Sequence, residues 1–207
     1  MFSRELAKRA PCSSSIVLVR AEVRMGDRVT VYIDGSNFYN GCRDELGRTD
    51  VKIGEFAIRL VGDREHVRTY YYNVPLSAEH PDEARRSQQK FYAALARTPY
   101  LEVRLGRMVK RSWRCKHCNM THERWLEKGV DMRLGVDMLS HASRDLFDVA
   151  ILVSGDGDYE HAVQAVKNLG KHVEVACFLG SRSDALLRAS DRMHQLDRAF
   201  FDGLFVR

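Results

Sequence analysis

The stretch FDVAILVSGDGD, residues 147–158, decides the fold. Its first seven residues are almost all apolar, and a short unbroken apolar run is typical of a strand that is buried on both faces. The glycines and aspartates that follow end the strand in a turn. A strand that is covered on both faces belongs to a parallel sheet lying between two layers of helices.

Further strands and helices alternate on either side of this stretch. We expect strands at 29–33, 67–74, 101–109 and 173–178, and helices at 54–60, 82–96, 130–142, 159–169 and 183–189. Residues 37–47 indicate a loop with a short helix, and residues 193–204 show no clear pattern. The alternation predicts an α/β fold, a three-layer α/β/α sandwich with a mainly parallel sheet. In such folds ligands bind beyond the carboxyl ends of the strands.

Aspartates gather at the expected ligand-binding edge of this sheet. Asp34 ends the first strand, Asp156 and Asp158 follow the strand quoted above, and Asp131 and Asp137 lie near the start of a helix. Each of them, taken singly, is more typical of a turn or a helix cap. Together they provide the carboxylate ligands that Mg²⁺ and Mn²⁺ prefer, and such ions promote in-line displacement at phosphorus.

Three strings carry a resemblance to a known family. They are VYIDGSNFYN (31–40), EKGVDMRLGVDML (127–139) and ILVSGDGDYEHAVQAVKNLGKHVEV (151–175). In this order they are similar to the NYN domain, in the LabA-like branch of the PIN-like nucleases, and the likeness extends from about Val29 to Leu196. The resemblance implies a metal-dependent ribonuclease that hydrolyses RNA phosphodiester bonds with Mg²⁺ or Mn²⁺ as its cofactor.

The resemblance also implies which residues form the site. The matching catalytic and metal-binding acids are Asp34, Asp131, Asp156 and Asp158, with Asp137 as an outer metal ligand. Asn37, which follows the first acid, matches a further residue of the same site. The residues that we expect to contact the substrate are Ser36, Asn37, Ser154, Arg107 and Lys110.

The segment WRCKHCNMTHERW, residues 113–125, interrupts the pattern and marks a small Cys/His hairpin insertion at 110–127. Cys115 and Cys118 have the spacing of a zinc knuckle, with His122 as a third ligand. Candidates for the fourth ligand are Cys42, His117 and a residue of a second copy in a homodimer. A redox-active Cys-x-x-Cys pair is disfavoured, because such a pair lies at the start of a helix and these two cysteines lie in a loop. An exposed hairpin with two free thiols explains the segment as well as structural Zn²⁺ does.

Basic and aromatic residues surround the same insertion. They are Arg104, Arg107, Lys110, Arg111, Arg114, Lys116 and Arg124, with Trp113 and Trp125. Proteins hold single-stranded RNA by pairing such cations with phosphates and stacking such rings on bases. An ordinary solvated hairpin explains the composition equally well.

The whole chain has 207 residues, a net charge of +5 and a pI of about 9.0, a balance that favours polyanionic partners. No apolar run is long enough for a transmembrane helix, so we expect no membrane partner. Five cysteines, an odd number, favour a reducing compartment, and we expect a cytoplasmic protein. We expect residues 1–27 to be a disordered N-terminal extension, too short of apolar residues for a signal peptide, and residues 28–207 to form the nuclease domain.

Two other classes of function are open alternatives. A catalytically silent RNA-binding or regulatory module would keep the fold without turnover, and the complete acidic set argues against it. A phosphatase with Asp34 as its nucleophile usually has a second aspartate two residues later, where this chain has Ser36.

Overall fold

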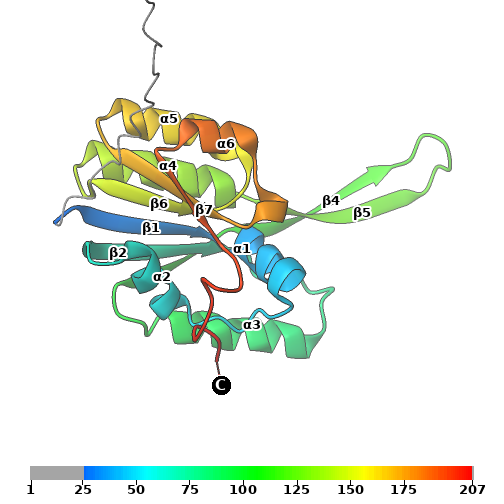
Figure 1. The fold of residues 1–207 in the computed structure, drawn as a ribbon. Helices are drawn as coiled ribbons and strands as arrows, with labels where there is room; N and C mark the ends of the chain where they lie inside the picture. The colour runs from blue at the N-terminus through cyan, green and yellow to red at the C-terminus, as the bar shows by residue number, and fades with distance from the viewer. Residues whose placement is uncertain (1–25, 207) are drawn as a thin grey trace, which may run out of the picture.

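The structure, a computed structural model, describes residues 26–206. These residues form the predicted α/β/α sandwich (Figure 1). Six parallel strands make the central sheet, in the order β3-β2-β1-β6-β7-β8. The strands are β1 (Arg28–Asp34), β2 (Glu65–Asn73), β3 (Leu101–Leu105), β6 (Val149–Val153), β7 (His172–Cys177) and β8 (Arg192–Gln195). Almost all of the extension predicted at 1–27 lies outside the described residues.

Helices cover both faces of the sheet (Figure 1). One face carries α1 (Gly35–Gly41) with a π-helical continuation (Cys42–Leu46), α2 (Ile53–Val61) and α3 (Asp82–Leu95), and the other carries α4 (Val130–Ser143), α5 (Glu160–Asn168) and α6 (Asp184–Ala189). Strand side chains alternate between two apolar cores: Val31 and Ile151 pack in the first, and Tyr32 and Leu152 in the second. The structure confirms the predicted buried strands and the helices predicted at 82–96 and 130–142.

The segment predicted as one strand at 101–109 is wrong in its extent. It divides at Gly106, whose backbone N–H donates to the carbonyl oxygen of Asn73 at 2.8 Å. After Gly106 the chain leaves the sheet and forms an antiparallel hairpin of β4 (Arg107–Arg114) and β5 (Thr121–Lys128), which projects from the body (Figure 1). A Cβ at Gly106 would lie 2.9 Å from the carbonyl oxygen of Lys128, so glycine is needed where the two limbs of the hairpin pass each other.

The tail at 193–204, for which the sequence shows no pattern, completes the fold. β8 adds an edge strand to the sheet, and Phe201 and Leu204 are buried in the core beneath α1 and α2. Among residues 26–206 no helix is long and apolar enough to cross a membrane.

The strand order creates one special position. From β1 the chain proceeds outward to β2 and β3, and from the neighbouring β6 it proceeds in the opposite direction to β7 and β8. The loops after β1 and β6 therefore diverge, and the crevice between them is where open α/β sheets bind ligands. Asp34 ends β1 at this crevice, and the SGDGD turn follows β6.

Candidate active site

Asp34 is the buried centre of the crevice, with 5% of its surface exposed. Its Oδ1 accepts a hydrogen bond from the backbone N–H of Asn37 at 3.1 Å, which makes Asp34 the N-cap of α1. Its Oδ2 lies 3.2 Å from the hydroxyl of Ser154 and 3.4 Å from the hydroxyl of Tyr159, both of which donate to it. The residues at the ends of β1 and β6 thus fix this carboxylate.

Tyr159 joins two of the predicted acids. Its hydroxyl lies 3.1 Å from Oδ1 of Asp131 as well as 3.4 Å from Oδ2 of Asp34. Burial raises the pKa of Tyr159 far above its ordinary value, and the charges of Asp34, Asp131 and Asp156 raise it further, so the hydroxyl keeps its proton and remains a donor. Tyr159 follows the SGDGD turn directly, but its apolar ring makes it look like an ordinary core residue in the sequence.

The SGDGD turn is held by its own backbone. The N–H of Gly155 donates to Oδ1 of Asn37 at 3.1 Å, and the N–H of Asp158 donates to Oδ1 of Asp156 at 3.0 Å. A Cβ at Gly155 would lie only 2.0 Å from the carbonyl oxygen of Ser181, so only glycine fits there. Asp156 is half-buried and Asp158 is exposed, which places Asp158 at the rim of the site.

Among the described residues, the acids of the crevice have no basic partner. Burial raises the pKa of Asp34 to about 6, and the charges of Asp131 and Asp156 add to the rise, while hydrogen bonds from Asn37 and Ser154 oppose it. Across residues 26–206, no lysine, arginine or histidine forms an ion pair with these three acids or with Asp158.

This donor set suits a hydrated divalent ion. Its ligand atoms are carboxylate oxygens, the hard donors that Mg²⁺ and Mn²⁺ prefer. No three of the described carboxylates at this edge approach within 4.8 Å of one another. Mg²⁺ retains several waters and takes only one or two protein carboxylates, so a closely packed cage of acids is not needed.

Asp137 lies in a different cluster from the other acids. Its Oδ2 accepts hydrogen bonds from the hydroxyl of Tyr72 at 2.9 Å and from Nη1 of Arg104 at 2.7 Å. Unlike Asp34 and Asp131, Asp137 therefore has its charge compensated by an arginine.

The family of the chain follows from a match over most of its length. Residues 28–197 match the family model of the NYN domain. The chain belongs to the NYN domain family. It is therefore a member of the PIN-like nuclease superfamily, whose domains are generally nucleases that act on nucleic acid and usually use divalent metal ions.

Solved structures support the NYN fold. A crystal structure of a Vibrio parahaemolyticus protein of unknown function superposes with a TM-score of 0.60 and 21% sequence identity, over 84% of this chain and 94% of that chain. At this identity the likeness shows the fold alone. No curated protein matches the sequence.

The NYN domain also places the base of its hairpin beside the acids. The pKa of Glu127, near the end of β5, is raised by desolvation and by the charge of Asp131. Sequence reasoning missed Glu127, although it directly precedes the KGVD segment. A groove of 590 Å³ opens here between α1, α3 and the hairpin, lined by Ser36, Asn73, Glu127, His80 and Gln88 among others.

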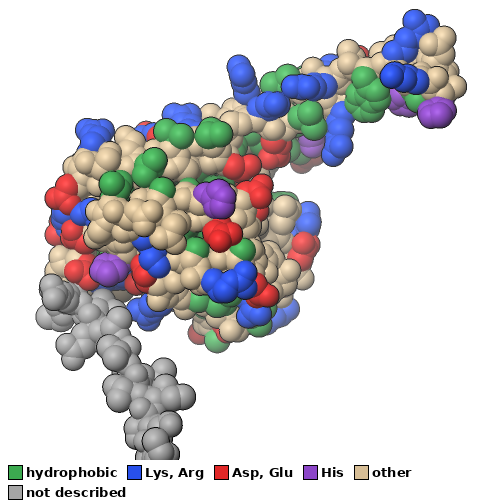
Figure 2. Space-filling view, turned by 90° about the horizontal axis from the view of Figure 1, so that it is seen from above, with side chains coloured by type: hydrophobic (Ala, Val, Ile, Leu, Met, Phe, Trp, Pro, Cys, Tyr) green, Lys and Arg blue, Asp and Glu red, His purple; other side chains and the backbone are tan. Residues whose placement is uncertain are grey.

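The residues expected to contact substrate are distributed around these features. Ser36 donates to Oδ1 of Asn73 at 3.3 Å on the wall of the groove. Arg107 is exposed at the base of the hairpin, and Lys110, further out, forms a 2.7 Å ion pair with Glu123. The hairpin carries its lysine and arginine side chains outward from the body (Figure 2).

Proposed function

We propose that this NYN domain is a metal-dependent ribonuclease that hydrolyses RNA phosphodiester bonds. The observation that carries the proposal is that the Tyr159 hydroxyl contacts both Asp34 and Asp131, while Asp156 is close enough for its charge to raise the pKa of Asp34. Asp34 is buried, Asp156 is half-buried and Asp131 is exposed. Like charges beside a buried carboxylate destabilise the fold, which favours a site that a cation or a reaction uses.

The proposed roles follow from the contacts. Asp34, Asp131 and Asp156 would hold Mg²⁺ or Mn²⁺, with Asp158 at the rim. Such ions supply Lewis-acid polarisation of a phosphate and a bound water of lowered pKa. The hydroxyl of Tyr159 lies between two of the carboxylates and orients them by sharing its single proton between them. Because Arg104 already compensates Asp137, we propose that Asp137 positions α4 and is not a direct ligand.

The chain's own surfaces favour a single-stranded substrate. Glu127 lines the groove at the base of the hairpin, and the charge of Asp131 raises the pKa of this glutamate. Lysine and arginine side chains are spaced along the hairpin to its tip (Figure 2). Trp113, with 51% of its surface exposed, offers a ring on which a base can stack. These features support RNA as the substrate, as the LabA-like branch to which we assign the chain implies. A cytoplasmic location and a homodimer stay predictions.

Cleavage of defined substrates tests this proposal. End-labelled single-stranded RNA, double-stranded RNA and single-stranded DNA would be incubated with the protein in Mg²⁺, in Mn²⁺ and with chelator. We expect cleavage of single-stranded RNA with either metal, none with chelator, and slower cleavage of the other substrates. RNA that is bound but never cleaved in either metal would contradict the proposal and favour a silent RNA-binding module.

A further inference from the structure

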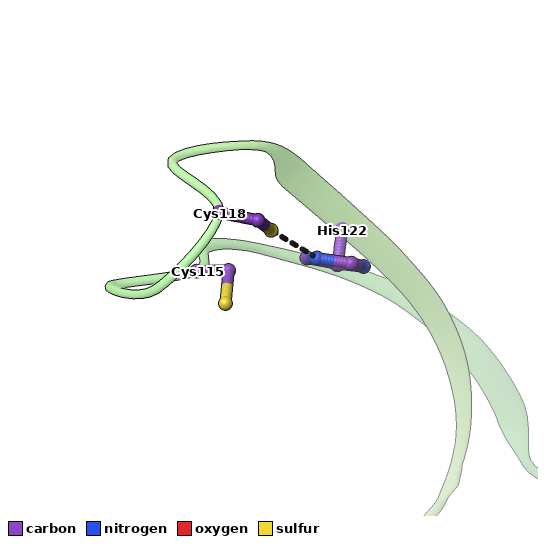
Figure 3. A group of neighbouring side chains, drawn as sticks. All are labelled: Cys115, Cys118 and His122. Carbon is purple, nitrogen blue, oxygen red and sulfur yellow. Dashed lines mark hydrogen bonds between the residues drawn. The ribbon is translucent and has the colours of Figure 1, made fainter.

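The tip of the β4–β5 hairpin brings three metal-binding side chains together. Cys115 follows β4, Cys118 lies in the turn and His122 belongs to β5. One ligand atom from each residue lies within 4.8 Å of the others, and Sγ of Cys118 is 3.5 Å from Nε2 of His122. Figure 3 shows Cys118 and His122 pointing toward one another, with Cys115 contributed by the other limb of the turn.

The backbone of the turn already has the shape that such a site needs. The N–H of Cys115 donates to the carbonyl oxygen of Met120 at 2.8 Å, and the N–H of Asn119 donates to that of Cys115 at 2.9 Å. Asn119 has a φ of 58°, in the left-handed region that asparagine tolerates better than most residues. Nε of Arg114 donates to the carbonyl oxygen of Asn119 at 3.1 Å and ties down the same residue.

A further contact prepares one of the ligands. The ring of Trp113 stacks on the ring of His122, with centroids 5.7 Å apart and an interplanar angle of 22°. This stacking restricts the orientation of the imidazole.

We propose that Cys115, Cys118 and His122 bind one Zn²⁺ ion at the hairpin tip. Thiolate and imidazole are ligands that Zn²⁺ prefers and Mg²⁺ does not, so this site is distinct in its chemistry from the acids at the sheet edge. Nearly every residue of the outer hairpin is exposed, so the tip has no apolar core, and metal binding supplies its folding free energy. Within residues 26–206 no fourth acidic, cysteine or histidine ligand joins the set, so water or a residue of a second copy would complete it.

Metal analysis of the full chain tests the site. The protein would be purified under reducing conditions without chelator, its zinc content measured, and the metal-free form titrated with Zn²⁺ and with Co²⁺, whose absorption reports tetrahedral thiolate coordination. We expect one zinc per chain. Cys115→Ser and His122→Asn should weaken the binding at least about 100-fold, because loss of an outer partner alone costs about 10–100-fold.

Two control variants make the test specific. His117→Asn alters the same turn outside the proposed set and should keep the zinc, and Asp34→Asn should keep it because the acids are a separate site. Unchanged thermal unfolding of the main domain would show that the ligand variants remain folded. Reduced wild-type protein that binds no Zn²⁺, or loss of zinc from either control as complete as from Cys115→Ser, would overturn the proposal.

Discussion

Asp34 shows how a single residue is shared between folding and the proposed chemistry. As the N-cap of α1 it stabilises the fold through the N–H of Asn37. As a buried carboxylate close to Asp131 and Asp156 it destabilises the same fold. A bound cation would offset the charge of Asp34 and remove this destabilisation. A substitution that removes the charge should therefore stabilise the metal-free protein while it abolishes activity.

A substitution at Asp34 should stabilise the metal-free protein in a pH-dependent way. The pKa of Asp34 is about 6 when folded, against 3.8 for an unperturbed aspartate. Below pH 3.8 the side chain is protonated in both states, and its charge costs no stability. Between pH 3.8 and 6 the unfolded chain ionises more readily than the folded protein, so the free energy of unfolding falls. Above pH 6 the loss of stability is complete. In chelator at pH 8, Asp34→Asn should raise the free energy of unfolding by about 1–3 kcal/mol, and at pH 4 by almost nothing. Urea unfolding at both pH values measures this, and a loss of stability at pH 8 would refute it.

Tyr159→Phe should weaken metal binding without removing a ligand. The hydroxyl orients Asp34 and Asp131 from outside the proposed ligand set. Loss of such an outer partner typically weakens metal affinity by about 10–100-fold, and loss of the hydrogen bond should cost about 1–2 kcal/mol of stability. Calorimetric titration with Mn²⁺ provides the measurement. Tyr39→Phe, at an exposed position, serves as the control, and equal affinities for the two variants would exclude a role for the Tyr159 hydroxyl.

At the scale of elements, predictability follows burial. The strands at 29–33 and 147–153 are recognisable because parallel central strands are apolar on both faces. The hairpin is recognisable in the sequence only by its Cys/His turn. The bounds of its strands are not, because its side chains face solvent on both sides and leave no apolar alternation. β8 has the sequence RMHQ, and its place depends on distant residues. The positions of Asp34 and Asp156 were predictable because they follow strand ends, and Asp131 was assigned through the family resemblance. The contacts of Tyr159 and Glu127 depend on tertiary structure, which the sequence pattern does not show.

The SGDGD turn should not tolerate a side chain at its first glycine. A methyl group at Gly155 would collide with the backbone of Ser181, which belongs to the loop after β7. Gly155→Ala should cost about 1–3 kcal/mol of stability and displace the proposed metal-binding carboxylates. Gly135→Ala, where the nearest atom, Cβ of Ala162, is 3.4 Å away, should be neutral or stabilising. Thermal unfolding compares the two, and equal melting temperatures would count against the close-packed turn.

The attachment of β8 should depend on a buried ion pair. Glu174 of β7 lies 2.9 Å from Nη1 of Arg64 and 2.7 Å from Nε2 of His194, and both members of the arginine pair are nearly inaccessible. Burial opposes ionisation of Glu174, but these partners lower its pKa to about 2. Its contribution to stability should be complete above pH 4.5 and lost as the pH falls toward 2.

Glu174→Gln leaves Arg64 buried without its partner and should cost about 3–5 kcal/mol at pH 7. Glu55→Gln, which breaks the exposed pair with Lys52 at 3.2 Å, should cost less than about 1 kcal/mol. Urea unfolding of both variants gives the comparison. An equally small loss of stability in both variants would show that the buried ion pair of Glu174 does not hold β8 in place.

At the scale of the whole molecule, the α/β/α sandwich holds the proposed catalytic acids and the projecting β4–β5 hairpin is proposed to bind the substrate. The sheet reverses its direction of winding between β1 and β6, and this reversal brings acids from three separate segments to one crevice. The hairpin begins beside that crevice and extends beyond the body, carrying basic residues outward (Figure 2). Catalysis and substrate capture should therefore be separable by mutation.

Single-turnover cleavage of labelled single-stranded RNA in Mn²⁺ tests the central claim most directly. The comparison needs wild type, Asp34→Asn and the control Asp63→Asn, which changes an exposed acid just before β2, at the opposite edge of the sheet. We predict that Asp34→Asn lowers the cleavage rate by at least about 1,000-fold while remaining folded, and that Asp63→Asn cleaves like wild type. Equal rates for Asp34→Asn and Asp63→Asn would contradict an active site at the acidic crevice.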